Sequence, residues 1–214
     1  IKQLWADVPA RANRGERPIY DIPDNQEPIV AIATDKEAQF TRIELEYKHN
    51  VLPDSLQLTM TAYTQDVLND IVSRILNYRF SEITQKPDAS FVGAYGFYSE
   101  LVKAKDAFQL IAVPKEGHEK QALTDLLIEA EKVKRFGFNN SELERGKAES
   151  LTEYEYDYIQ RNNQLNIDLT RDYIRHYLDK TCTPGIEWEF QMLQVMLPQI
   201  NIELLNRLAQ NYVI

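Results

Sequence analysis

The stretch that decides the fold is FVGAYGFYSELVKAKDAFQLIAV, residues 91–113. It contains two runs rich in aromatic and branched residues, Phe91–Tyr98 and Phe108–Val113, separated by a charged turn at Lys103–Asp106. Strand-forming residues on both sides of a polar turn predict an antiparallel hairpin. We therefore expect the sheet of this protein to be antiparallel around these residues.

Strand and helix patterns precede the hairpin. Ile29–Thr34 is a short apolar run that predicts a buried strand, whereas residues 42–48 alternate between apolar and charged side chains and predict a half-exposed one. Residues 53–55, Pro-Asp-Ser, offer a turn with an N-cap, and apolar side chains then recur every three or four residues from Leu56 to Ile75. This spacing predicts a long amphipathic helix that ends before Pro87.

Helical patterns fill the chain after the hairpin. The first, Leu123–Val133, should stop near Gly137, and Ser141 with Glu144 is predicted to form the capping box of the next helix. Shorter helices are expected at Leu169–Leu178, Ile186–Leu197 and Ile202–Tyr212. Strands that precede and interrupt helices without strict alternation predict an α+β fold, an antiparallel sheet covered by helices.

The N-terminal part is expected to be a connector. Residues 9–28 hold four of the nine prolines and show little apolar periodicity, which predicts an extended segment. Residues 1–8 are predicted to be the end of a helix, and the first residue, Ile1, suggests a processed or excised chain. We expect residues 1–214 to form a single α+β domain whose main body is 29–214.

Composition excludes several classes of function. The 24 basic and 33 acidic residues give a net charge of −9, which argues against nucleic-acid binding because phosphate contacts need a basic face. No apolar stretch approaches the roughly 18 residues of a membrane span. The 7 glycines are scattered and form no phosphate-binding loop.

Residues with catalytic or metal-binding potential are isolated in the sequence. His49, His118 and His176 have no second histidine one helical turn away, so surface or capping roles are expected. Cys182 has no adjacent base and is interpreted as an ordinary thiol. The residues themselves therefore predict no catalytic group, no cofactor-binding group and no metal ligand in this chain.

The run Glu153–Tyr158 has the most unusual local composition, with acidic and tyrosine side chains in alternation. It could attract a cationic peptide. Alternatively, Tyr154 and Tyr158 lie on the apolar stripe of a helix while the carboxylates face solvent, and helical spacing favours this interpretation. A strand is less consistent with the capping box just upstream.

Four segments, taken in order, resemble a known family. They are LNYRFSEI at 76–83, PDASFVGA at 87–94, GF at 137–138 leading into SELERGK at 141–147, and PGIEWE at 184–189. Their order and spacing resemble the second, non-zinc domain of the insulinase/pitrilysin family of zinc metallopeptidases, especially the bacterial members. The resemblance extends over most of the chain.

The resemblance implies a mitochondrial-processing-peptidase-like metallohydrolase domain whose first strand is truncated. In such enzymes repeated α+β domains enclose a chamber, and zinc is expected in the preceding domain rather than in this chain. The implied partners are that catalytic domain of the same polypeptide and peptide substrates. The implied location is the periplasm or cell envelope.

One departure from the family pattern bears on function. Partner domains of the family often carry an Arg directly after the Glu-Ile pair and a Tyr seven residues later, but here these positions hold Thr84 and Phe91. We therefore expect a non-catalytic domain that forms part of the chamber wall and helps to confine peptides, with a possible preference for cationic ones. The alternatives are a stand-alone binding or scaffold domain and an independent hydrolase that uses unidentified carboxylates.

Overall fold

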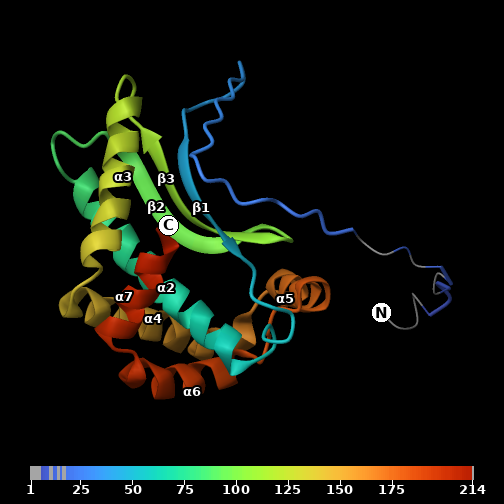
Figure 1. Ribbon diagram of the computed structural model, residues 1–214. Coiled ribbons are helices and arrows are strands. Elements are labelled where there is room, and N and C mark those ends of the chain that lie inside the picture. The colour runs from blue at the N-terminus through green and yellow to red at the C-terminus, as the bar shows by residue number, and fades with distance from the viewer. Residues whose placement is uncertain (1–5, 10–11, 14, 16–17, 214) are drawn as a thin grey trace.

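The computed structural model describes residues 6–9, 12–13, 15 and 18–213, and has an α+β architecture. Three strands, β1 (Ile43–Asn50), β2 (Phe91–Val102) and β3 (Lys105–Pro114), form an antiparallel sheet in the order β1-β3-β2. The helices are α2 (Met60–Thr84), α3 (Glu119–Phe136), α4 (Asn140–Gln160), α5 (Asn166–Asp179), α6 (Ile186–Met196) and α7 (Ile202–Tyr212). Most of them lie on one side of the curved sheet (Figure 1). The predicted fold class is confirmed.

The hairpin is built as the sequence predicts, but its turn is shorter. Lys105 and Asp106 belong to β3, so only residues 103–104 connect the two strands. Leu110 pairs with Leu45 on one side and Gly96 on the other. A Cβ at Gly96 would lie 2.7 Å from Leu110 Cδ2, so glycine lets the two strands pack closely under α2.

The core lies between the sheet and the helices. Helix α2 packs on β2, α3 packs on β3 and β1, and α7 packs on α3 and α2. Phe80 of α2 meets Phe91 of β2 edge to face, with ring centroids 6.3 Å apart, and both rings are completely buried. Alternation along β1 turns its apolar side chains toward this core and leaves Glu44 and Glu46 on the opposite face.

Two helices begin at a different capping residue from the predicted one. Helix α2 begins after Thr59, whose side chain accepts a hydrogen bond from the Thr61 N–H, because residues 53–59 are occupied by successive turns. Helix α4 begins after Asn139, which forms a reciprocal capping box with Glu142 in place of the predicted pair Ser141 and Glu144. The pair Asn139 and Glu142 satisfies the free backbone N–H groups of the first turn as the predicted pair would have done, but the helix begins two residues earlier.

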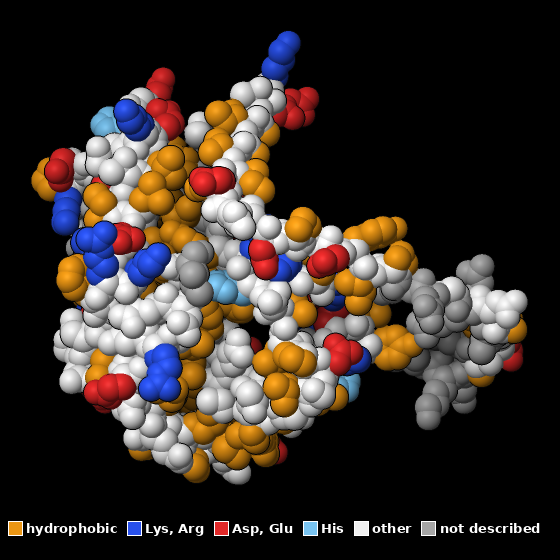
Figure 2. Space-filling view, in the orientation of Figure 1, with side chains coloured by type: hydrophobic (Ala, Val, Ile, Leu, Met, Phe, Trp, Pro, Cys, Tyr) orange, Lys and Arg blue, Asp and Glu red, His pale blue; other side chains and the backbone are white. Residues whose placement is uncertain are grey.

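The predicted buried strand Ile29–Thr34 is wrong. These residues form no strand and are exposed, with Val30 at 82% and Ile32 at 88% of full exposure. They belong to an arm that rises away from the sheet and carries hydrophobic side chains along its length (Figure 2). An apolar run indicates that burial is favourable, but a strand also needs a neighbouring strand for its backbone hydrogen bonds. Among the described residues β1 pairs only with β3, so residues 29–34 have no strand partner.

The segment before the arm is tied to the sheet. The buried ammonium of Lys105 lies 2.7 Å from Asp24 Oδ1 and 2.7 Å from Asn50 Oδ1, and Lys48 Nζ donates to the Pro23 carbonyl at 2.9 Å. Residues 18–28 are otherwise without helix or strand. The predicted helix end at residues 1–8 falls largely on residues 1–5, outside the described residues, while residues 6–8 form a turn and a bend.

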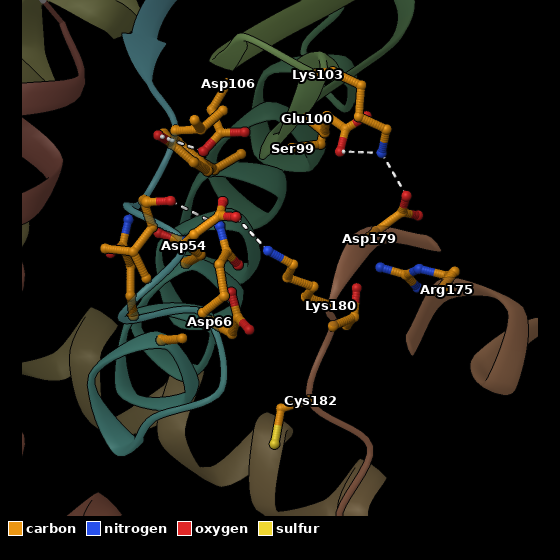
Figure 3. Close-up of a pocket in the computed structure, with 18 of the residues that line it drawn as sticks. Asp54, Asp66, Ser99, Glu100, Lys103, Asp106, Arg175, Asp179, Lys180 and Cys182 are labelled. Atoms are coloured by element: carbon orange, nitrogen blue, oxygen red, sulfur yellow. Dashed lines mark hydrogen bonds and ion pairs between the residues drawn. The ribbon is translucent and has the colours of Figure 1, made fainter. Parts of the chain in front are cut away.

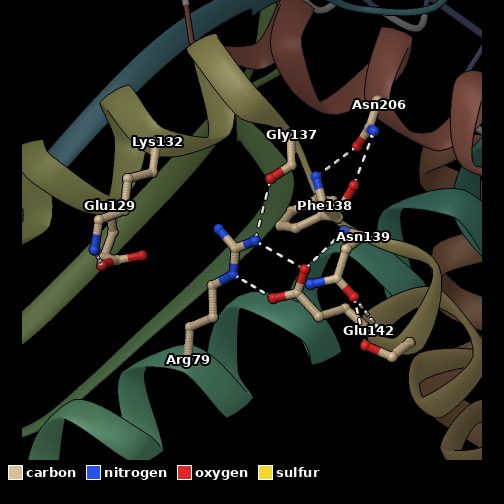
Figure 4. Close-up of polar contacts among 9 residues, drawn as sticks. Arg79, Glu129, Lys132, Gly137, Phe138, Asn139, Glu142 and Asn206 are labelled. Carbon is tan, nitrogen blue, oxygen red and sulfur yellow. Dashed lines mark hydrogen bonds and ion pairs between the residues drawn. The ribbon is translucent and has the colours of Figure 1, made fainter.

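A polar junction fixes the turn between α3 and α4 (Figure 4). Arg79 donates to both carboxylate oxygens of Glu142, at 2.6 and 2.9 Å, and to the Gly137 carbonyl at 3.1 Å. Asn206 of α7 holds Phe138 from the other side by accepting from its N–H at 2.7 Å and donating to its carbonyl at 3.0 Å. The junction thus joins α2, the α3–α4 turn and α7.

Candidate functional site

The candidate site is an open cavity of about 460 Å³ between the N-terminal half of α2, the end of the β2–β3 hairpin and the C-terminal end of α5 (Figure 3). Five carboxylates and three cationic side chains line it. They are Asp54, Asp66, Glu100, Asp106 and Asp179 with Lys103, Arg175 and Lys180. A cavity of this size and polarity suits a small polar or charged group.

Asp106 is the most perturbed carboxyl in the cavity. It lies on β3 and faces the helices, where burial raises its pKa to about 6 although the Tyr98 hydroxyl, 3.4 Å away, donates to it. The charges of Glu100 and Asp66 raise this pKa further. Burial also raises the pKa of Asp66, which Arg175 partly opposes. Asp66 retains contact with solvent because the cavity itself is open.

The cationic side chains are used mainly to hold the cavity wall together. Lys103 at the hairpin turn pairs with Asp179 of α5 and, at 3.2 Å, with Glu100. Lys180, in the left-handed conformation at the end of α5, pairs with Asp54. The hydrogen bond that Lys103 donates to Asp179 raises the pKa of Lys103 and so keeps it charged. These contacts connect α5 to the hairpin turn and to the turn before α2.

An aromatic cluster forms the floor behind Asp106. Tyr98 stacks on Tyr212 with ring centroids 4.5 Å apart, and His49 meets both rings at 5.8 and 5.5 Å. His49 is half-buried in the cluster, and its Nε2 lies 3.1 Å from the carbonyl of Tyr212, the last residue of α7, which is a capping contact at the end of that helix. Burial lowers the pKa of His49, although the Tyr212 carbonyl opposes this.

The three histidines are not brought together. His118 is the exposed N-cap residue of α3, and His176 places Nδ1 2.8 Å from the Thr181 carbonyl at the end of α5. Among the described residues no group of three or more His, Cys, Asp or Glu side chains has a geometry that could hold a metal ion. The donors present in this part of the chain therefore do not fit a zinc ion.

Cys182 lines the cavity but is set apart from its carboxylates (Figure 3). It is half-buried, and its sulfur forms no disulfide. The acidic tyrosine run follows the favoured interpretation, since Tyr154 packs against the core and Tyr158 stacks on Phe190 at 5.1 Å. Tyr156 and the acidic residues of the run face solvent.

The two positions at which the family pattern changes have structural roles here. Phe91 is a fully buried core residue against Phe80. Thr84 is the last residue of α2, and its hydroxyl donates to the Ser81 carbonyl at 2.7 Å. Neither position lines the cavity.

Sequence reasoning missed Asp66, Asp106 and Arg175. The sequence predicts a turn that includes Asp106. In the structure Asp106 belongs to β3, and because side chains alternate along a strand it shares the helix-facing side with Phe108 and Leu110. No comparable local signal marks Asp66 or Arg175, because their approach depends on how α5 lies across α2.

The sequence and the fold of this chain were compared with those of known proteins. No protein-family profile matches the chain. The chain is 22% identical over 210 residues to an Arabidopsis thaliana protein described as zinc protease PQQL-like. The aligned region covers 98% of this chain and 19% of that protein. The chain therefore spans about a fifth of the length of this curated relative.

Solved structures share the fold. The first half of the periplasmic protease PqqL from Escherichia coli superposes with a TM-score of 0.73 at 18% identity, over 83% of this chain and 38% of that one. The inactive peptidase domain of a putative zinc protease from Bordetella parapertussis superposes with a TM-score of 0.50 at 17% identity, over 83% and 87% of the two chains.

These likenesses confirm the resemblance found in the sequence. The chain has the fold of the insulinase-family zinc peptidases, and solved inactive peptidase domains share that fold. The particular relatives are proteases of the PqqL type, of which this chain matches one portion. Within the described residues no helix is long and apolar enough to cross a membrane.

Proposed function

We propose that this chain is a non-catalytic domain of a longer zinc metallopeptidase of the insulinase family, and that it forms part of the wall of a proteolytic chamber. The observation that carries the proposal is the match of nearly the whole chain, 98%, to a portion of a zinc protease. The fold shared with an inactive peptidase domain supports the same role. Zinc would be held by the preceding domain.

The proposal includes the organisation of the chain. Residues 29–214 would form the main body of one α+β domain, and residues 9–28 would connect it to the preceding domain. The pairing of Lys105 with Asp24 supports this division, because it fixes where the connector meets the sheet. We propose a periplasmic or cell-envelope location, which agrees with the description of Escherichia coli PqqL as a periplasmic protease.

The open face of the sheet is the surface suited to confining a peptide. Glu44 and Glu46 of β1 lie on this face, and Tyr95 and Phe97 of β2 stack with ring centroids 6.1 Å apart. Glu44 and Tyr95 both pair with Ile111 of the central strand, so an acidic and an aromatic side chain flank Ile111 on this face. Such a face would attract cationic, partly apolar peptides.

The first experiment compares the polypeptide encoded by the complete gene with the chain of 214 residues. The longer polypeptide should contain H-x-x-E-H before this chain, bind stoichiometric zinc and cleave unstructured peptides. The chain alone should bind no stoichiometric zinc and cleave nothing. A gene without that motif would instead favour a stand-alone binding or scaffold domain, and robust cleavage by the chain alone would favour an independent hydrolase.

The second experiment tests the chamber wall. In the active longer polypeptide, the double variant Glu44→Gln/Glu46→Gln should reduce the preference for basic over acidic peptides of equal length. A matched control, Glu155→Gln, removes an exposed carboxylate from α4 on another surface and should leave the preference unchanged. An unaltered preference in the double variant would refute a substrate-facing role for this face.

A further inference from the structure

Helix α5 is amphipathic in sequence. At 100° per residue its apolar side chains occupy one half of the helix and its charged side chains the other. The apolar half holds Ile167, Leu169, Tyr173, Ile174, Tyr177 and Leu178, and we call the first four of these residues the α5 apolar face. The polar half holds Asp168, Arg171, Asp172, Arg175, His176 and Asp179.

The helix turns mainly its polar half toward its own domain, and from the apolar half Leu178, near the end of the helix, also lines the cavity. Arg175 and Asp179 reach the cavity, and Asp179 pairs with Lys103. Asp179 is also the only α5 residue that is not exposed. By contrast, Ile167 is 60%, Tyr173 68% and Ile174 51% exposed.

This orientation is the reverse of the usual one. A surface helix normally gains most of its stability by burying its apolar stripe. Here α5 contributes no buried residue and is connected to the domain through ion pairs. Exposed ion pairs stabilise weakly, so they do not by themselves explain a helix with so regular an apolar half.

We propose that the α5 apolar face is the surface on which another domain of the same polypeptide packs. This inference rests on the proposed function. A curated relative is about five times as long as the matched portion, since the chain spans 19% of it. In the PqqL half-structure this fold occupies 38% of the chain, which leaves room for a further domain of similar size beside it.

Charge argues for this occupant over two others. A second copy would bring two chains of net charge −9 together, which opposes association. A membrane-surface helix is rich in Lys and Arg on its polar half. The polar half of α5 instead carries three aspartates against two arginines, and its arginines lie on the side of the cavity or pair within the helix.

The test compares amide hydrogen exchange of residues 167–178 in the chain alone and in the longer polypeptide. We expect exchange to be at least tenfold slower in the longer polypeptide, because a covered helix opens less often. The double variant Ile167→Asn/Ile174→Asn should abolish this difference. The matched control Asp168→Asn/Asp172→Asn changes the polar half of the same helix and should retain it.

Equal exchange in both forms would overturn the inference. So would slowing in the chain alone that grows with chain concentration, because it would assign the face to a second copy. Neither variant pair should shift the thermal midpoint of the chain alone, since the substituted side chains are exposed there.

The readouts separate this inference from the proposed function. Slowed exchange in a longer polypeptide without zinc or cleavage would overturn the function and leave the interface standing. An active zinc peptidase with unprotected α5 would overturn the interface alone. A gene that encodes no further domain would overturn both.

Discussion

Replacing Arg79 with methionine should destabilise the chain by about 2–3 kcal/mol, because it removes the cation from a partly buried junction. The side chains of Arg79 and Glu142 are only 18% and 12% exposed. Removing one member of a fully buried pair costs about 3–5 kcal/mol. Glu142 would keep its hydrogen bond from the Asn139 N–H, at 2.8 Å, so we expect a loss of about 2–3 kcal/mol, below the cost for a fully buried pair.

The pH dependence of this effect follows from Glu142. Burial opposes its ionisation, but the hydrogen bonds from Arg79 and the Asn139 N–H prevail and lower its pKa. A carboxyl whose pKa is lower in the folded state stabilises the fold above its unfolded pKa, about 4.3, and loses this contribution as pH falls through the folded pKa. The difference between wild type and Arg79→Met should therefore shrink below about pH 4.

Urea unfolding followed by circular dichroism, at pH 7 and pH 3.5, measures the free energy of unfolding directly. The control is Arg135→Met, which breaks an exposed pair with Glu131 and should cost at most about 0.5 kcal/mol. A loss below about 0.5 kcal/mol for Arg79→Met at pH 7 would refute the structural role of the junction.

Three further predictions concern single residues. Gly137→Ala should destabilise the chain by about 3 kcal/mol in thermal unfolding, because φ is +66° and the new Cβ would lie 2.4 Å from Asn206 Oδ1. The control Gly117→Ala, where φ is +76° and the space around the new Cβ is open, should cost about 1 kcal/mol. The contribution of Asp106 to stability should fall by about 1 kcal/mol as pH rises from about 4 to about 6, since Asp106 holds its proton more tightly when folded, and the difference in unfolding free energy between wild type and Asp106→Asn measures that fall. The contribution of His49 has the opposite sign: it should fall as pH drops from about 6.5 through the lowered pKa of His49, and the difference between wild type and His49→Phe in urea titrations at several pH values measures it.

Local patterns predict the elements well where burial and period agree. The β2–β3 hairpin, β1 and the α2 stripe all combine a clear period with a face that meets the core. The arm at 29–34 fails because apolar content indicates burial but cannot supply a pairing strand. The α4 start fails by two residues because Asn139 and Ser141 are both competent caps, and the choice between them depends on Arg79 holding Glu142.

The cavity is less accessible to prediction than the elements around it. Its carboxylates come from α2, β3 and the end of α5, so no window of sequence contains them together. The periodicity of 169–178 predicts an apolar stripe, and the natural inference is that this stripe faces the core. In the structure the charged half of α5 faces the cavity instead. This orientation depends on the three-dimensional path of the chain after α4, which the local sequence pattern does not specify.

Two of the four segments that carry the family resemblance meet at one place. Arg79 from the first, Gly137 and Phe138 from the third, and Glu142 just after them form the junction of α2 with the α3–α4 turn. These contacts fix helix positions and do not reach the cavity. In this chain these contacts are structural, so this part of the resemblance reports how the chain folds. What the domain does within a longer protein must be decided by the surfaces that the junction leaves free, the open sheet face and the α5 apolar face.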